Sequence, residues 1–246
     1  MKVWLVALML GLLSGVPAAA EPLRIAVASN FVDAMDALIA SWEQSSGQPV
    51  ERITASTGKL YAQIVHGAPF DLFFAADAER PRRLEAEGRA LAGSRFTYAL
   101  GRLVLWSPDE DRVDAQGRVL RDGDFRFLAI ANPKLAPYGR AARELLESLG
   151  LWQSLQSRLV RGENIGQAFH FVASGNAELG LVAWSQISRP GRPVEGSWWL
   201  PPAAYYTAVE QQAVQLTQHP QAEAFLRFVR GTAARQIIRQ QGYDLP

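Results

Sequence analysis

The sequence predicts an α/β fold of two lobes. Strand-like apolar segments alternate with segments of helical periodicity, and this order implies mainly parallel sheets with helices on both faces. The alternation occurs in two runs, and the second run is long. We therefore expect the chain to leave the first lobe near Leu100 and to return to it near 206–212. Lobe 1 then comprises 21–100 and 209–246, and lobe 2 comprises 101–208.

The first run contains three predicted strand–helix pairs. Their strands are expected over 23–28, 50–54 and 72–75, where short apolar segments occur. Their helices are expected over 31–42, 60–65 and 79–87. Gly67-Ala68-Pro69 ends the second helix and Gly88 ends the third.

The second run begins after Gly101. Its strands are expected over 103–106, 127–131 and 179–183, and its helices over 139–149, near Trp152 and over 165–172. The polar segment 109–124 and the Pro- and Gly-rich segment 189–202 are expected to be irregular. A strand over 210–216 and two helices, one from Pro220 and one over 232–240, follow.

Residues 1–20 are predicted to form a secretory signal peptide. A basic Lys2, an apolar run over 3–13 and Ala18-Ala19-Ala20 before Glu21 fit that pattern. The apolar run is shorter than the roughly 20 residues that span a bilayer. A retained anchor helix is the alternative. With the leader removed we expect a soluble protein located in the periplasm.

The composition argues against nucleic-acid binding and against covalent links through cysteine. Without the leader the chain has 24 basic and 24 acidic residues, so we expect no nucleic-acid binding through a basic face. The chain has no cysteine, so it can carry neither disulfides nor a lipid on an N-terminal cysteine.

Two junctions in the first run predict an anion site. Ser29-Asn30 follows a strand and precedes a helix, and Ser56-Thr57 does the same. Hydroxyl and amide donors then lie beside free backbone N–H groups and the positive end of a helix dipole, which favours an anion. Plain helix capping is the alternative at each junction. Ser56-Thr57-Gly58-Lys59 is only half of a phosphate-binding P-loop, because Ile53 and Leu60 break the motif.

The second run offers two comparable helix starts. Pro133 and Pro137 stiffen a loop that places Tyr138 at a helix start, and Glu163-Asn164 precede a helix that begins with Ile165. Packing of Tyr138 and an ordinary turn before Ile165 are the alternatives. Enzymatic motifs are weak: His66, His170 and His219 lack metal-ligand spacing, and no G-x-S-x-G elbow occurs. We therefore interpret the chain as a receptor rather than an enzyme.

In order and spacing, these segments resemble the molybdate-binding periplasmic proteins of ATP-driven importers. The resemblance extends over the mature chain and rests on five segments: Ala26 to Asn30, Ser56 to Ile64, Gly67 to Leu72, Asn132-Pro133, and Ala177 to Val182. It implies the type II periplasmic binding protein fold, with two α/β lobes joined by crossing hinge strands. It also implies a monomer that binds molybdate or tungstate, requires no cofactor, and associates with a membrane permease and its ATPase.

The resemblance assigns a ligand-binding position to each junction. The candidate anion-binding residues are Ser29, Asn30, Ser56, Thr57, Tyr138 and Ile165. Asn30 would bind through side chain and backbone, Thr57 and Tyr138 through hydroxyls, and Ile165 through its backbone N–H. One branch of the family has a tyrosine where this chain has Ala183, and Tyr138 resembles the substitute of a second branch. The alternatives are the same fold binding sulfate, phosphate or an organic anion, and a secreted hydrolase.

Overall fold

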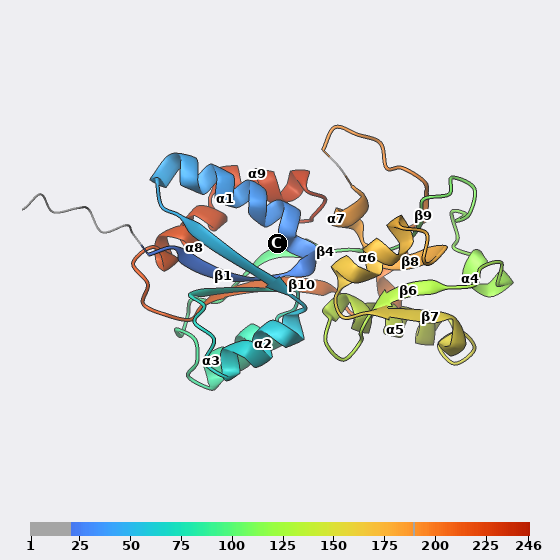
Figure 1. The fold of residues 1–246 in the computed structure, drawn as a ribbon, viewed down its shortest axis with the longest axis horizontal. Helices are drawn as coiled ribbons and strands as arrows, with labels where there is room; N and C mark the ends of the chain where they lie inside the picture. The colour runs from blue at the N-terminus through green and yellow to red at the C-terminus, as the bar shows by residue number, and fades with distance from the viewer. Residues whose placement is uncertain (1–20, 189) are drawn as a thin grey trace, which may run out of the picture.

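The computed structural model describes residues 21–188 and 190–246 and contains two α/β lobes that lie side by side (Figure 1). Lobe 1 is built on a sheet with the strand order β2-β1-β3-β10-β4. Its strands are β1 (Leu23–Ala28), β2 (Val50–Ala55), β3 (Leu72–Ala75), β4 (Phe96–Gly101) and β10 (Val209–Gln215). Its helical elements are the 3-10 turn η1 (Ser29–Phe31) and the helices α1 (Val32–Ser46), α2 (Thr57–Val65), α3 (Glu79–Ala86), α8 (Ala222–Arg230) and α9 (Thr232–Gln240).

Strand β1 shows how the sequence covers both faces of this sheet. Ile25 and Val27 pack in one cluster with residues of α1, α8 and α9, whereas Ala26 packs in another with residues of α2 and α3. Successive side chains of a strand point to opposite faces, so an uninterrupted apolar strand is buried on both. Figure 1 shows the corresponding layers, with α1, α8 and α9 on one side of the sheet and α2 and α3 on the other.

Lobe 2 is built on the strand order β7-β6-β8-β5-β9. Its strands are β5 (Leu103–Ser107), β6 (Leu128–Ala131), β7 (Leu159–Gly162), β8 (Leu179–Ala183) and β9 (Ser197–Trp199). Its helical elements are α4 (Val119–Asp122), α5 (Pro137–Ser148), η2 (Gln156–Arg158), α6 (Ile165–Ala173), α7 (Trp184–Ile187) and η3 (Ala203–Tyr205). The chain crosses between the lobes from β4 into β5, and again between η3 and β10.

Each sheet is mixed: four of its five strands run in one direction, as expected for a mainly parallel sheet, and one strand runs against them. β1 is parallel to β2 and β3, and β6 is parallel to β7 and β8. β10 is antiparallel to β3 and β4, and β5 is antiparallel to β8 and β9. β10 and β5 are the first strands after the two crossings. A chain that enters from the other lobe arrives at the ends where the parallel strands finish, so the strand that it forms runs against them.

Several expectations about individual elements need correction. The helix near Trp152 is wrong, because residues 152–155 form turns and the N–H groups of Leu151 and Trp152 both donate to the Leu146 carbonyl. The segments 189–202 and 109–124 are not wholly irregular, because β9 pairs with β5 within the first and α4 lies within the second. The strands β4 and β7 were not predicted. The expected leader 1–20 lies outside the described residues, and no helix of the described chain has the length and apolar character needed to cross a bilayer.

Candidate functional site

Four helical segments begin just after the carboxyl ends of parallel strands. In lobe 1, η1 follows β1 and α2 follows β2; in lobe 2, α5 follows β6 and α6 follows β7. The carboxyl ends of parallel strands are where open α/β sheets bind ligands. The four segments begin at or beside the predicted residues Ser29, Asn30, Ser56, Thr57, Tyr138 and Ile165.

The caps of these helices leave their first backbone N–H groups without intrahelical acceptors. The Ser56 hydroxyl accepts from the Lys59 N–H at 3.4 Å, and the Asn164 side chain accepts from the Gln167 N–H at 3.0 Å. Each cap accepts the N–H of the third residue of its helix, so the N–H groups of the first two residues have no acceptor within the helix. Ala28 and Ala136 precede η1 and α5 and offer no side-chain cap. The helix starts therefore present N–H donors at their positive ends.

The helix starts of the two lobes contact each other. The Gly58 N–H donates to the Leu135 carbonyl at 2.8 Å, which joins the beginning of α2 to the loop before α5. A Cβ on Gly166 would lie 3.8 Å from the Ser29 side chain, so the beginning of α6 faces η1. Ala28 and Ala76 of lobe 1 also belong to one buried apolar cluster with the lobe 2 residues Ala136, Tyr138, Ile165 and Ala183.

Thr57 and Tyr138 are buried hydroxyl donors. The Thr57 hydroxyl oxygen accepts the Ala76 N–H at 3.0 Å, which leaves its proton available to a second acceptor. The Tyr138 side chain is 1% exposed, and its hydroxyl has no hydrogen-bond partner among the described residues. Burial raises the pKa of Tyr138 well above the usual tyrosine value of about 10. Its hydroxyl therefore stays protonated at neutral pH and can donate.

Asn30 is held by residues far away in the sequence. Its amide nitrogen donates to Gln211 at 2.7 Å and to the Tyr243 hydroxyl at 3.1 Å, and Tyr243 donates back to the Asn30 carbonyl at 2.5 Å. Both side-chain N–H groups of Asn30 thus have acceptors within the protein. Its backbone N–H has no acceptor inside η1 and is therefore the Asn30 donor that remains available.

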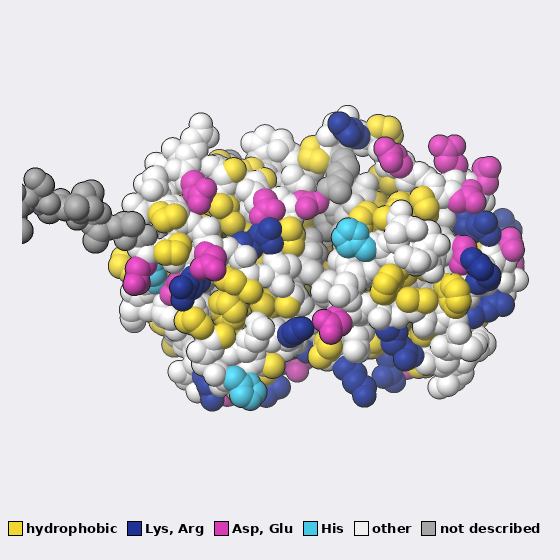
Figure 2. All heavy atoms as spheres, in the orientation of Figure 1, with side chains coloured by type: hydrophobic (Ala, Val, Ile, Leu, Met, Phe, Trp, Pro, Cys, Tyr) yellow, Lys and Arg dark blue, Asp and Glu magenta, His cyan; other side chains and the backbone are white. Residues whose placement is uncertain are grey.

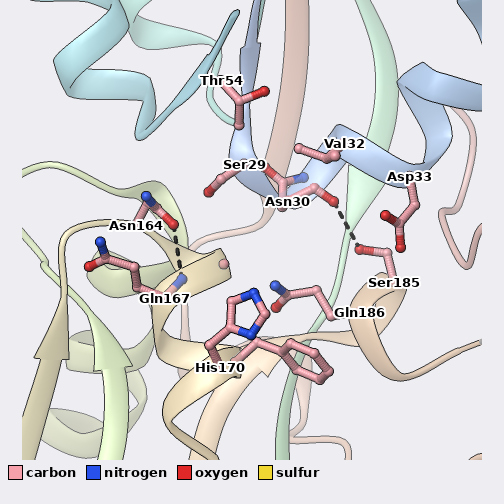
Figure 3. A pocket seen from close by; sticks show the side chains of 12 residues that line it. Ser29, Asn30, Val32, Asp33, Thr54, Asn164, Gln167, His170, Ser185 and Gln186 are labelled. Atoms are coloured by element: carbon pink, nitrogen blue, oxygen red, sulfur yellow. Dashed lines mark hydrogen bonds between the residues drawn. The ribbon is translucent and has the colours of Figure 1, made fainter. Parts of the chain in front are cut away.

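A cleft of about 400 Å³ opens between η1 and α6 (Figure 3). Ser29 and Asn30 line it, together with groups that the sequence analysis did not assign to the site. These are Val32, Asp33, Thr54, Asn164, Gly166, Gln167, Phe169, His170, Ser185 and Gln186. Ser56, Thr57, Tyr138 and Ile165 do not line this cleft; Thr57, Tyr138 and Ile165 are at most 2% exposed and lie deeper. Ser185 and Gln186 could have been found from the sequence, because they lie in α7, the short helix that follows β8, another strand of the parallel core.

Three cationic side chains near the helix starts, those of Lys59, Arg80 and Arg140, are ion-paired. Arg80 has a guanidinium nitrogen 3.2 Å from the point where a Cβ on Gly58 would lie, and this guanidinium is ion-paired with the buried Asp77. Lys59 of α2 is 3.3 Å from Glu163 of the opposite lobe. Arg140 of α5 is 3.1 Å from Glu79 of α3, also across the lobes. These pairs bring no net charge, so N–H and O–H dipoles are the donors left for a ligand.

The described residues offer no metal centre. They contain no group of three or more His, Asp or Glu side chains arranged to hold an ion. On the face of the molecule drawn in Figure 2, acidic and basic side chains are interspersed and the histidines lie apart from one another.

Comparisons with known proteins agree with this geometry. The family model for bacterial extracellular solute-binding proteins matches residues 23–244. The molybdate-binding protein ModA of Azotobacter vinelandii is 46% identical over 243 residues, which is 98% of this chain and 96% of that protein. The molybdate-binding protein ModA of Rhodobacter capsulatus is 44% identical over 96% of this chain and 93% of that protein.

A solved structure supports the same relationship. The periplasmic molybdate-binding protein of Azotobacter vinelandii superposes with a TM-score of 0.89 at 43% identity, covering 91% of this chain and 99% of that one. The bilobed fold predicted from the sequence is therefore confirmed, and so is the interpretation as a binding protein rather than an enzyme. The chain belongs to the family of bacterial extracellular solute-binding proteins and, within it, to the group of the molybdate-binding proteins.

Proposed function

We propose that this protein is a periplasmic receptor that captures molybdate, and also tungstate, and delivers it to an ATP-driven importer. The observation that carries the proposal is the convergence of four helix starts from both lobes, which bring hydroxyl and N–H donors together. The names of the relatives at 46% and 44% identity point to the same ligand.

The donor set suits a fully deprotonated tetrahedral dianion. Such an ion carries only acceptors, so every contact with it must come from an N–H or O–H group. Phosphate near neutral pH keeps a proton and calls for an acceptor carboxylate. None of the predicted binding residues has one, whereas Asp33 lines the cleft, so titration with phosphate decides this point. Each charge-assisted hydrogen bond contributes about 1.5–3 kcal/mol. Five or more such bonds are enough for a dissociation constant in the micromolar-to-nanomolar range after the cost of ordering.

The anion would stabilise the closed arrangement of the lobes. Asn30 and Thr57 come from lobe 1, and Tyr138 and Ile165 from lobe 2, so the full donor set exists only when the lobes meet. A ligand that binds one arrangement better shifts the population toward it. We propose that the permease recognises this closed form and that the lobes move as the units 21–100 plus 209–246 and 101–208.

Isothermal titration of the mature chain, residues 21–246, with separate anions tests the proposal. Molybdate and tungstate should each bind at one site with micromolar affinity or better, and sulfate and phosphate should bind at least a hundredfold more weakly. Sulfate binding without molybdate binding would instead support another member of the same fold. Turnover in an esterase or phosphatase screen would support the hydrolase alternative.

Molybdate affinity should change little between pH 6.5 and pH 9. Burial raises the pKa values of Tyr98, Tyr138 and Tyr243 above about 10, so these hydroxyls keep their protons over that range. The pKa values of these tyrosines are higher in the folded protein than in the unfolded chain, so their ionisation at high pH favours unfolding. The free energy of unfolding is therefore unaffected by them below the pKa of an exposed tyrosine and falls as the pH rises above it. Titration calorimetry at several pH values, with thermal unfolding from pH 8 to 11, checks both parts. A steep loss of affinity between pH 7 and 8 would contradict the first.

A further inference from the structure

Gln211 is a buried amide between the two halves of the proposed site. It lies on β10, the strand that follows the second crossing, and its side chain is fully buried. The β4–β10 ladder shifts its register between Gln211 and Gln212, because Tyr98 of β4 has no partner there. Irregularities of this kind redirect side chains and are frequent beside functional sites.

The oxygen of Gln211 faces lobe 1. It accepts the Asn30 amide N–H at 2.7 Å and lies 3.2 Å from the Tyr98 hydroxyl. Gln211 therefore fixes the side chain of Asn30, whose backbone belongs to the η1 turn of the proposed site.

The nitrogen of Gln211 faces lobe 2. It has no hydrogen-bond partner among the described residues, and neither has the Tyr138 hydroxyl. Both atoms crowd the point where a Cβ on Gly101 would lie, so they are neighbours. The amide also opposes the effect of burial on the pKa of Tyr138, as a donor beside the phenolic oxygen does. Neither atom has another polar partner among the described residues, which is rare for buried groups. A hydrogen bond from the Gln211 amide to the Tyr138 oxygen would satisfy that donor and would leave the tyrosine proton for a ligand between the lobes.

We propose that Gln211 is a positioning residue that directs the proton of Tyr138 toward the bound anion. When the lobes close on the anion, the Gln211 N–H donates to the Tyr138 oxygen, so the hydroxyl must donate its own proton elsewhere. The same amide holds Asn30 through its oxygen. A single side chain on β10 thus fixes the position of Asn30 in lobe 1 and the direction of the Tyr138 hydroxyl in lobe 2. This inference rests on the proposed function.

The first test combines Gln211→Met with Tyr138→Phe. Methionine keeps the length of the side chain and removes both hydrogen-bonding groups. By titration calorimetry, Gln211→Met should weaken molybdate binding about tenfold. Tyr138→Phe should then cost less than threefold in the Gln211→Met background, although it costs at least tenfold in the parent, because the two groups act through one contact.

Gln215→Met is the matched control. Gln215 lies on the same strand and is also buried, but its amide donates to the Thr217 carbonyl, away from the site. Its substitution should leave molybdate affinity unchanged. Circular dichroism and thermal unfolding show whether each variant folds.

The second test uses a pH profile of Gln211→Glu. An ionised Glu at this position accepts a hydrogen bond from the Tyr138 hydroxyl, which turns that donor away from the anion, and its negative charge repels the anion. A protonated Glu can donate to the Tyr138 oxygen as the amide does. Burial raises the pKa of such a carboxyl. At pH 8.5 we expect Gln211→Glu to bind molybdate more than a hundredfold more weakly than the parent. At pH 6 the difference between the two affinities should be at least tenfold smaller. The titratable or charged groups that act on the surrounding tyrosines are Asp33, Asp77, Arg102 and Tyr206. They are common to parent and variant, so the difference between the two profiles reports residue 211.

The outcomes separate the two proposals. Suppose that the parent binds molybdate but Gln211→Met has the same affinity, or the effects of Gln211→Met and Tyr138→Phe on affinity multiply in the double variant. Either result overturns this inference and leaves the proposed function intact. A loss in Gln211→Glu that does not vary with pH also overturns it, because such a loss reflects structure only. A parent that fails to bind molybdate or tungstate overturns the proposed function, and this inference with it.

Discussion

Tyr138→Phe is expected to weaken molybdate binding at least tenfold without lowering the stability of the ligand-free protein. The change removes one hydroxyl donor to an anion, a contact of about 1.5–3 kcal/mol, and each 1.4 kcal/mol corresponds to about tenfold in affinity. Among the described residues the hydroxyl has no hydrogen-bond partner, so its removal breaks no hydrogen bond there. The ring keeps its packing in the buried cluster.

Titration calorimetry with molybdate and thermal unfolding without it measure the two halves of this prediction. Tyr205→Phe serves as the control, because Tyr205 is 37% exposed and lies in η3, outside the helix starts. It should bind as the parent does. Unchanged affinity in Tyr138→Phe would remove this residue from the proposed site. A large drop in melting temperature would show that its hydroxyl serves the fold instead.

Gly58→Ala is expected to weaken molybdate binding more than tenfold by preventing full closure. The new Cβ would lie 2.8 Å from the Leu135 carbonyl oxygen and 3.2 Å from the Leu135 Cα, both backbone atoms of the opposite lobe. Backbone cannot move aside as a flexible side chain can, so the lobes must stay further apart. Gly58 is the second residue of α2, where alanine is at least as good a helix former as glycine. The melting temperature of the ligand-free protein should therefore be equal to or above that of the parent.

Gly231→Ala is the matched control for this substitution. Its Cβ would lie 3.0 Å from the Phe228 carbonyl, a comparably tight contact within lobe 1. It should lower the melting temperature and leave molybdate affinity unchanged. Small-angle scattering with saturating molybdate should show Gly58→Ala as more open than the parent. Equal affinity and equal compaction would mean that the Gly58–Leu135 contact does not belong to the closed state.

The secondary structure was predictable where burial on both faces made the pattern simple. β1, β3 and β8 are short apolar strands, and their predicted bounds match the structure. β4 and β7 were missed because they are partly exposed and carry polar residues among apolar ones. The helix near Trp152 was predicted from local apolar residues that instead pack as turns against lobe 2.

The candidate site was predictable to the level of helix starts. Ser29, Ser56, Tyr138 and Ile165 could be located because hydroxyl, proline and cap residues mark these junctions locally. The partners of Asn30 could not be found in this way. Gln211 and Tyr243 lie 181 and 213 residues further along the chain, and no local pattern indicates that they meet it.

The sequence by itself determined the α/β class, the order of most elements and the four places where a strand delivers donors to a helix. These features depend on periodicity and on capping chemistry, which act between residues a few positions apart. Only the tertiary structure decided that the strands following the crossings run antiparallel, that α2 meets the loop before α5 and α6 faces η1, and that Gln211 lies between Asn30 and Tyr138. Those outcomes depend on how distant strands pair and how two lobes pack, and burial drives that packing without regard to separation along the chain.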